Sequence, residues 1–211
     1  MYTLYGTAGS GSAAVEAALS IAKAPFRLVE ASSWQPGPGL DALRRVNPLA
    51  RVPTLVLPDG SVLSESAAIL IHLGLQFPES GLLPSDISSR AQAIRGLVYI
   101  SASCYAAIGA IDYPERWYSG AGEQESERIR STTRQRLHHS WDVFADTFPG
   151  TPYLSGEAPG ALDLLAVVVS KWAGARAHLL ASRPKFSALL SNIEKHQRFA
   201  KFQAKHWPAA G

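Results

Sequence analysis

The chain has 211 residues, 46% of them hydrophobic and 18% charged, and its formal net charge is +3. This composition is typical of an ordinary globular protein with enough apolar residues for a core, rather than of a disordered chain. The single cysteine, Cys104, excludes an internal disulfide and a thiolate-rich zinc site.

The first eighty residues predict a mixed sheet with helices packed on it. Tyr2 to Tyr5 reads as a strand, Ala13 to Lys23 as a helix with apolar residues at helical spacing, and Phe26 to Val29 as a second strand. Residues 31–40 hold two prolines and two glycines and predict a loop. A short helix, a hairpin and a further helix follow: Asp41 to Val46, Val52 to Leu63 with its turn at Asp59-Gly60, and Ala67 to Phe77.

The rest of the chain predicts only helices. Pro78 to Asp86 reads as a linker, and the long periodic segments beyond it are Ser89 to Tyr113, Glu125 to Phe148, Leu162 to Leu180 and Lys185 to Lys205. We therefore expect an α/β domain at 1–79, of βαβ-α-ββα order and thioredoxin-like, followed by an all-helical domain at 87–211. The large aromatic residues of the second part are expected to fill its core: Trp141, Phe144, Trp172 and Phe186.

Charge and hydropathy limit the partners of the chain. The basic excess lies after residue 80, with 15 basic against 11 acidic side chains, but the two signs alternate along residues 123–136. That pattern is typical of a solvated helix face, so we expect no nucleic acid as a partner. Residues 1–11 carry no lysine or arginine, and the run Leu164 to Val169 is too short to span a bilayer. We expect a cytoplasmic protein without a membrane partner.

Two motifs at a fixed spacing carry the functional signal. Asn47-Pro48-Leu49-Ala50-Arg51-Val52-Pro53 leads into a strand, and Ser64-Glu65-Ser66 opens a helix eleven to thirteen residues later. Together, behind the βαβ opening, they resemble the glutathione transferase family, in which an N-P-x-x-x-V-P turn and an E-S helix start have this spacing. The resemblance covers nearly the whole chain, because the family continues into a helical domain. It implies glutathione as co-substrate and a cis Val52-Pro53 bond.

The resemblance implies a role for each of these residues. Val52, beside Pro53, would bind the backbone of a peptide through its own N–H and C=O, by β-strand addition. Ser66 at a helix start would hold a carboxylate, Glu65 would meet an ammonium, and Arg51 would reach a second carboxylate or lie in solvent. The structural alternatives are an edge strand that begins at Pro53 and simple helix capping by Ser66 with a first-turn acid.

The loop Thr7 to Ser12 would then activate the thiol. A free thiol with a pKa near 8.5 is only about 3% thiolate at pH 7, and a hydroxyl hydrogen bond to the anion lowers that pKa by about one to two units. In the family that this chain resembles, a Tyr, Ser or Cys near the end of the first strand does this. Ser10 falls closest to that place, with Ser12, Thr7 and Tyr5 as alternatives, while Ser10 or Ser12 also caps the first helix.

The remaining expectations concern the second substrate and the reaction. Tyr105, Tyr113 and Trp117 are candidates to line a pocket for a hydrophobic electrophile, whereas Cys104 is expected to be an inert buried thiol. The adjacent His138 and His139 point about 100° apart on a helix, and no acidic or cysteine set surrounds them at ligand spacing, so we expect no metal. We expect a glutathione transferase that acts in detoxification as a homodimer. The alternatives are a glutathione-dependent disulfide or peroxide reductase and a non-catalytic binding module of the same fold.

Overall fold

A computed structural model describes residues 1–120 and 122–208. The elements of the first part are β1 (Tyr2–Gly6), α1 (Ser12–Ile21), β2 (Phe26–Glu30), α2 (Pro38–Val46), β3 (Thr54–Val56), β4 (Val62–Ser64), α3 (Ser66–Gln76) and the 3-10 turn η1 (Pro78–Ser80). Those of the second part are α4 (Ile87–Tyr99), the π-helical segment η2 (Ile100–Tyr105), α5 (Ala106–Asp112), the 3-10 turn η3 (Pro114–Arg116), α6 (Glu123–Thr147), α7 (Ala161–Val169), α8 (Ala175–Ser182), α9 (Pro184–Lys195) and α10 (Ala200–His206).

The four strands form one mixed sheet in the order β2-β1-β3-β4. β1 runs parallel to β2 and antiparallel to β3, and β3 and β4 form an antiparallel hairpin. The hairpin turns at Gly60, whose φ of +89° is the positive value expected there. The predicted fold class is confirmed: a thioredoxin-like sheet with its helices, followed by an all-helical region.

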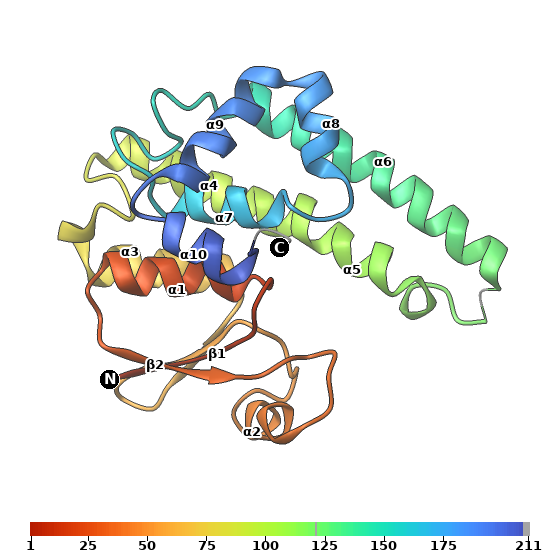
Figure 1. Cartoon of the computed structure of the whole chain (residues 1–211), viewed down its shortest axis with the longest axis horizontal. Helices are drawn as coiled ribbons and strands as arrows, with labels where there is room; N and C mark the ends of the chain where they lie inside the picture. Colours follow the sequence, from red (N-terminus) through yellow and green to blue (C-terminus); the bar gives the residue numbers. More distant parts are fainter. Residues whose placement is uncertain (121, 209–211) are drawn as a thin grey trace.

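The helices lie on both faces of this sheet (Figure 1). α1 and α3 cover the face toward the helical part, and α7 packs against both of them, so that one large apolar core runs from the sheet into the helices. α2 covers the opposite face and buries a small cluster formed by Tyr5, Ala31, Leu40 and Leu43. The expected core aromatics Trp141, Phe144 and Phe186 are buried, whereas Trp172 is only partly buried.

The run Ile87–Asp112 is one long helical segment that differs from the regular helix expected over Ser89 to Tyr113. Its central part is η2, in which the turn is widened to π-helical hydrogen bonding. By length and composition alone this run could cross a membrane. In the structure η2 packs against α6 and α7, and Ile100 and Cys104 lie in the shared core.

Two other predicted helices are each divided, and one begins earlier than expected. Leu162 to Leu180 is broken between α7 and α8, where Ala173 and Gly174 both adopt positive φ, at +52° and +78°. Lys185 to Lys205 is broken between α9 and α10, because His196 is extended. α2 starts at Pro38, within the segment predicted as loop, since proline is well suited to the first turn of a helix.

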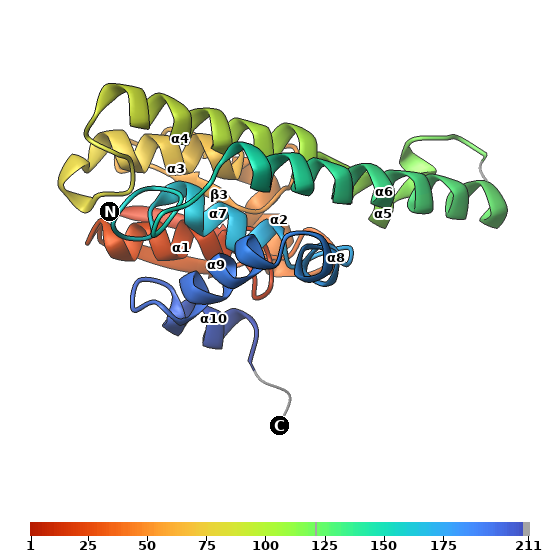
Figure 2. The same ribbon diagram turned by 90° about the horizontal axis from the view of Figure 1, so that it is seen from above.

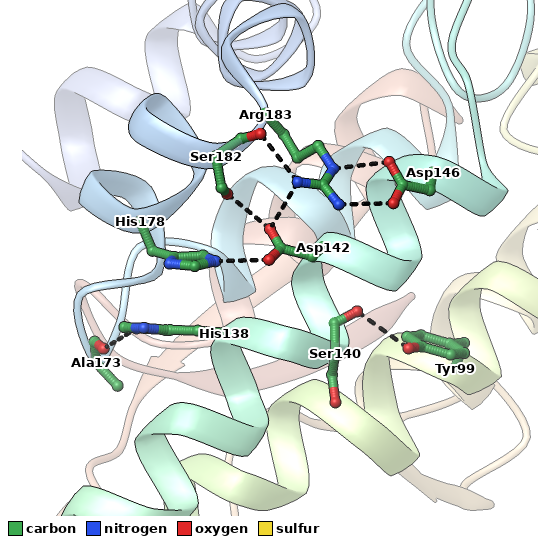
Figure 3. Close-up of polar contacts among 9 residues, drawn as sticks. All are labelled: Tyr99, His138, Ser140, Asp142, Asp146, Ala173, His178, Ser182 and Arg183. Atoms are coloured by element: carbon green, nitrogen blue, oxygen red, sulfur yellow. Dashed lines mark hydrogen bonds and ion pairs between the residues drawn. The ribbon is translucent and has the colours of Figure 1, made fainter.

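The α5–α6 pair projects from the rest of the molecule (Figure 2), and polar contacts bind the other end of α6 to α8 (Figure 3). Asp142 on α6 accepts a hydrogen bond from Ser182 at 2.7 Å and lies 3.0 Å from His178 Nε2. Burial alone would raise the pKa of Asp142, but Ser182, His178 and Arg183 lower it. A carboxylate in this position therefore joins α6 to α8 and to the start of α9.

The expected domain limits, 1–79 and 87–211, stay a prediction. Between them the described chain forms only η1 and an irregular stretch up to α4. Residue 121 and residues 209–211 of the predicted helical domain lie outside the described residues.

Candidate functional site

The turn before β3 is built by Asn47. Its side-chain amide donates to Thr54 Oγ1 at 2.8 Å, and its side-chain oxygen accepts the Leu49 N–H at 3.0 Å. Such local bonds from an asparagine side chain favour a turn over continuation of the preceding helix α2. The Val52-Pro53 peptide bond within this turn is cis, as the resemblance implied.

Val52 keeps its main-chain groups free. β3 begins at Thr54, which pairs with Tyr5 of β1 and Ser64 of β4. Across residues 1–120 and 122–208, no hydrogen bond uses the Val52 N–H or C=O. These two groups are therefore available to an extended backbone alongside the turn. Arg51 next to it is exposed, and no ion pair within the described chain engages it.

Glu65 and Ser66 open α3, but Ser66 is not the capping residue. Glu65 occupies the N-cap position with φ +67°, a value that non-glycine residues rarely adopt. Residues held in such conformations concentrate at functional sites. Its side chain is exposed, and the backbone N–H groups of the first turn behind it have no partner within the helix. The positive end of the helix dipole lies at the same point.

This helix start, which the sequence predicts to be open, is buried at Ser66, and the hydroxyl of Tyr105 lies near it. Ser66 is only 5% exposed. A methyl group added at Gly11 would lie 2.5 Å from Tyr105 Oη and 3.2 Å from Ser66 Oγ, so both hydroxyls face the same point of the loop. Burial, together with the charge of Glu65, raises the pKa of Tyr105 to about 12, although a backbone hydrogen bond with Gly11 acts in the other direction. The phenol is therefore uncharged at neutral pH.

The hydroxyls of Ser10 and Ser12 are used inside their own loop. Ser10 Oγ donates to the Thr7 carbonyl at 2.8 Å, accepts the Ser12 N–H at 3.2 Å and lies 2.7 Å from Ser12 Oγ. Ser10 is 4% exposed and Ser12 is fully buried. A serine hydroxyl has one proton, and Ser10 uses it in the bond to the Thr7 carbonyl, so in this arrangement Ser10 has no proton left to donate to a sulfur ligand. Ser10 as the thiol ligand stays a prediction that requires this loop to open.

The helix α10, near the C-terminal end of the described residues, contacts the same loop. His206 of α10 is buried, and its Nδ1 accepts the Gly9 N–H while its Nε2 lies 2.9 Å from Glu16 of α1. Lys205 also donates to Glu16. Burial alone would raise the pKa of Glu16, but the hydrogen bonds and charges of His206 and Lys205 outweigh it and lower the pKa. α10 thus ties the loop to the helix that follows it.

Tyr105 and Trp207 lie beside the loop, and Tyr105 is the one of the three predicted pocket residues for which the described chain shows this. The rings of Tyr105 and Trp172 are 5.3 Å apart, and Trp207 Nε1 would lie 3.8 Å from a methyl group at Gly9. Tyr113 and Trp117 follow α5, which carries them about 12 Å or more along the helix from Tyr105. Trp117 is 66% exposed. The structure does not bring these two residues to the loop.

Sequence reasoning missed Trp172, Trp207 and His206 as neighbours of the site. Trp172 was expected in the core, and nothing in the periodicity of its segment distinguishes it from the buried tryptophan Trp141. Cys104, next to Tyr105, is buried, and burial raises its pKa to about 12. Within the described residues, no group of three or more His, Cys, Asp or Glu side chains is arranged to hold a metal ion.

Comparisons with known proteins find glutathione transferases and GST-like proteins among the proteins similar to this chain. Residues 12–76 match the family described as glutathione S-transferase, N-terminal domain. The chain is 29% identical over 173 residues, 82% of each chain, to the uncharacterized GST-like protein YncG of Escherichia coli (strain K12). It is 33% identical over 134 residues to the probable glutathione S-transferase BZ2 of Zea mays, covering 59% of this chain and 54% of that one. A glutathione transferase homolog from Sulfitobacter, solved with bound glutathione, superposes with a TM-score of 0.83 at 25% identity and covers 97% of this chain and 98% of its own.

Proposed function

We propose that the chain is a glutathione transferase, which binds glutathione and transfers its glutathionyl group to an electrophilic, apolar or aromatic second substrate. The observation that carries this proposal is the pair of main-chain groups on Val52, in the turn before β3, which no hydrogen bond within the described chain uses. The similar Sulfitobacter protein with bound glutathione supports it.

In this proposal each end of the peptide meets a different element. The cysteinyl backbone pairs with the Val52 N–H and C=O beside Pro53. The γ-glutamyl carboxylate binds the Ser66 hydroxyl and the free N–H groups at the start of α3, and its ammonium faces Glu65. Arg51, exposed on the same turn, reaches the glycyl carboxylate.

The chemical step needs only an ionised thiol. The sulfhydryl proton passes to solvent, and the thiolate attacks an electrophilic carbon. A carbon–sulfur bond forms while the leaving group departs with its electron pair. The loop Thr7 to Ser12 lies at the N-terminus of α1, where the helix dipole favours the negative sulfur. The partly buried Trp172 and Trp207 offer apolar surface for the second substrate.

Calorimetric titration with S-methylglutathione tests the binding half of the proposal, because this ligand keeps both ends of the peptide but carries no ionisable thiol. We expect Ser66→Ala to weaken binding about tenfold or more, since a hydrogen bond to a charged group contributes about 1.5–3 kcal/mol. Ser64→Ala, two residues upstream in β4, is the matched control and should bind like the original chain. Absence of binding by the unmodified chain would contradict the proposal.

Product analysis tests the reaction. With chlorodinitrobenzene and glutathione we expect a thioether, with release of chloride. Glutathione disulfide formed from a peroxide, in place of a thioether, would indicate the reductase alternative, and binding without either product would indicate a non-catalytic module. We further propose that the chain acts in detoxification in the cytoplasm as a homodimer. Equilibrium ultracentrifugation tests the last point, and a single-chain mass over the working concentration range would contradict it.

A further inference from the structure

Tyr105 is the last residue of the π-helical segment η2, and its hydroxyl lies beside Gly11 of the loop, close to the hydroxyl of Ser66 at the start of α3. A π-helical turn contains one more residue than an α-helical turn, and such segments are frequent at functional sites. The widened turn changes the direction in which Tyr105 leaves the helix. Its ring rests against Trp172.

We propose that Tyr105, rather than Ser10, donates the hydrogen bond that stabilises the glutathione thiolate. This inference rests on the proposed function and names the residue of the helical part that touches the sulfur. Glutathione loses its thiol proton to solvent, Tyr105 keeps its own proton, and the phenol donates to the resulting sulfur anion. No other reactant is needed for this step.

The hydroxyl of Tyr105 is available as a donor. Within residues 1–120 and 122–208, no side-chain or backbone acceptor takes its proton in a hydrogen bond. The raised pKa, about 12, keeps that proton in place over the range in which the thiol ionises. Gly11 makes room for the phenol, because any side chain at this position would collide with Oη.

The four hydroxyls proposed from the sequence are less well placed. Ser10 and Ser12 are buried and bonded within the loop. Tyr5 belongs to the small cluster under α2, on the face of the sheet away from α1 and α3. Thr7 is half-buried, and its hydroxyl makes no hydrogen bond in the described chain, so it is the remaining competitor.

The main alternative is that the Tyr105 ring only fills the glutathione-binding position next to Ser66 and makes no hydrogen bond to the sulfur. Two substitutions separate these two roles. Tyr105→Phe keeps the ring and removes only the donor, whereas Tyr105→Ala removes both. Tyr99→Phe is the matched control, because Tyr99 lies on the preceding helix and donates to the Ser140 carbonyl at 3.0 Å, away from the loop (Figure 3).

The experiment measures the ultraviolet absorbance of bound thiolate against pH, together with S-methylglutathione affinity. We expect Tyr105→Phe to raise the pKa of the bound thiol by about one to two units and leave that affinity unchanged. Ser10→Ala, Thr7→Val and Tyr99→Phe should titrate like the original chain. If the thiol of the Tyr105→Phe variant titrates like that of the original chain, the proposal is wrong. Tighter S-methylglutathione binding by Tyr105→Ala would then show that the Tyr105 ring only blocks the glutathione-binding position. If the original chain binds no S-methylglutathione, the proposed function fails as well, whereas normal binding with an unchanged Tyr105→Phe titration removes this inference alone.

Discussion

The backbone N–H of Gly9 donates a hydrogen bond to Nδ1 of His206, 3.3 Å away and 197 residues further along the chain. Since Nδ1 accepts, the ring proton belongs on Nε2, which faces Glu16 at 2.9 Å. One buried imidazole therefore joins the glycine-rich loop, the first helix and α10. The geometry of the loop depends on a contact that spans the whole fold.

Replacing His206 tests this contact. His206→Ala leaves the Gly9 N–H without its acceptor and removes one of the partners of the buried Glu16 carboxylate. We expect a loss of about 2–4 kcal/mol in the free energy of unfolding, measured by urea denaturation. The control is His139→Ala, on an exposed position of α6, with an expected change within about 0.5 kcal/mol. Equal stabilities of the two variants would contradict a structural role for the contact.

Glu16 should make the free energy of unfolding depend on pH. Its pKa is lower in the folded chain than in the unfolded chain, so its contribution is complete at pH values above the unfolded pKa of about 4.3 and disappears as the pH falls through the lower, folded value. We expect the difference in unfolding free energy between the original chain and Glu16→Gln to be largest near neutral pH and to shrink below about pH 4. If this difference in unfolding free energy grew as the pH fell, folding would raise the pKa of Glu16 and not lower it.

Gly11 and Gly109 form a contrasting pair. A methyl group at Gly11 meets Tyr105 Oη at 2.5 Å, whereas one at Gly109 on α5 has no neighbour within 4 Å. Gly11→Ala should displace Tyr105 and raise the pKa of the bound thiol, while the chain stays folded as judged by circular dichroism. Gly109→Ala should leave that titration unchanged and stabilise the chain by up to about 1 kcal/mol, because alanine favours a helix. If Gly109→Ala raised the pKa of the bound thiol and Gly11→Ala left it unchanged, the close approach of Tyr105 to Gly11 would be contradicted.

Cys104 should be unreactive in the native chain. The thiol is buried, and burial raises its pKa to about 12, so the nucleophilic thiolate is almost absent at neutral pH. A thiol-specific chromogenic reagent should label it only after denaturant is added. Labelling in native buffer at the rate seen in denaturant would show that η2 opens readily.

Much of the first part of the fold could be predicted because its signals are local. Asp59-Gly60 specifies a tight turn, and Asn47 and Pro53 specify the turn before β3, where Asn47 bonds to residues two and seven positions away. The hairpin and the start of α3 follow from such short-range features, whereas the cis Val52-Pro53 bond was expected only from the family resemblance.

The rest could not be predicted, because it depends on contacts between distant segments. Nothing in the sequence around Ala173 indicates its positive φ, which divides the predicted helix, and the π-helical turn at η2 interrupts a run with unbroken helical periodicity. The sequence predicts that Tyr105, Tyr113 and Trp117 line one pocket, because all three lie on or after the first long predicted helix. Their separation in the structure results from the direction of α5.

The π-helical turn has a consequence for how this site changes among relatives. An α-helix turns by about 100° per residue, so deletion of one residue within Ile100–Tyr105 would restore a regular helix and rotate α4 and α5 by that angle relative to each other. Such a deletion would remove the phenol from the loop without altering any residue of the sheet. In this fold, one residue gained or lost in a helix would therefore be enough to give or withdraw a hydroxyl at the loop, and a comparison that counts only substitutions would overlook it.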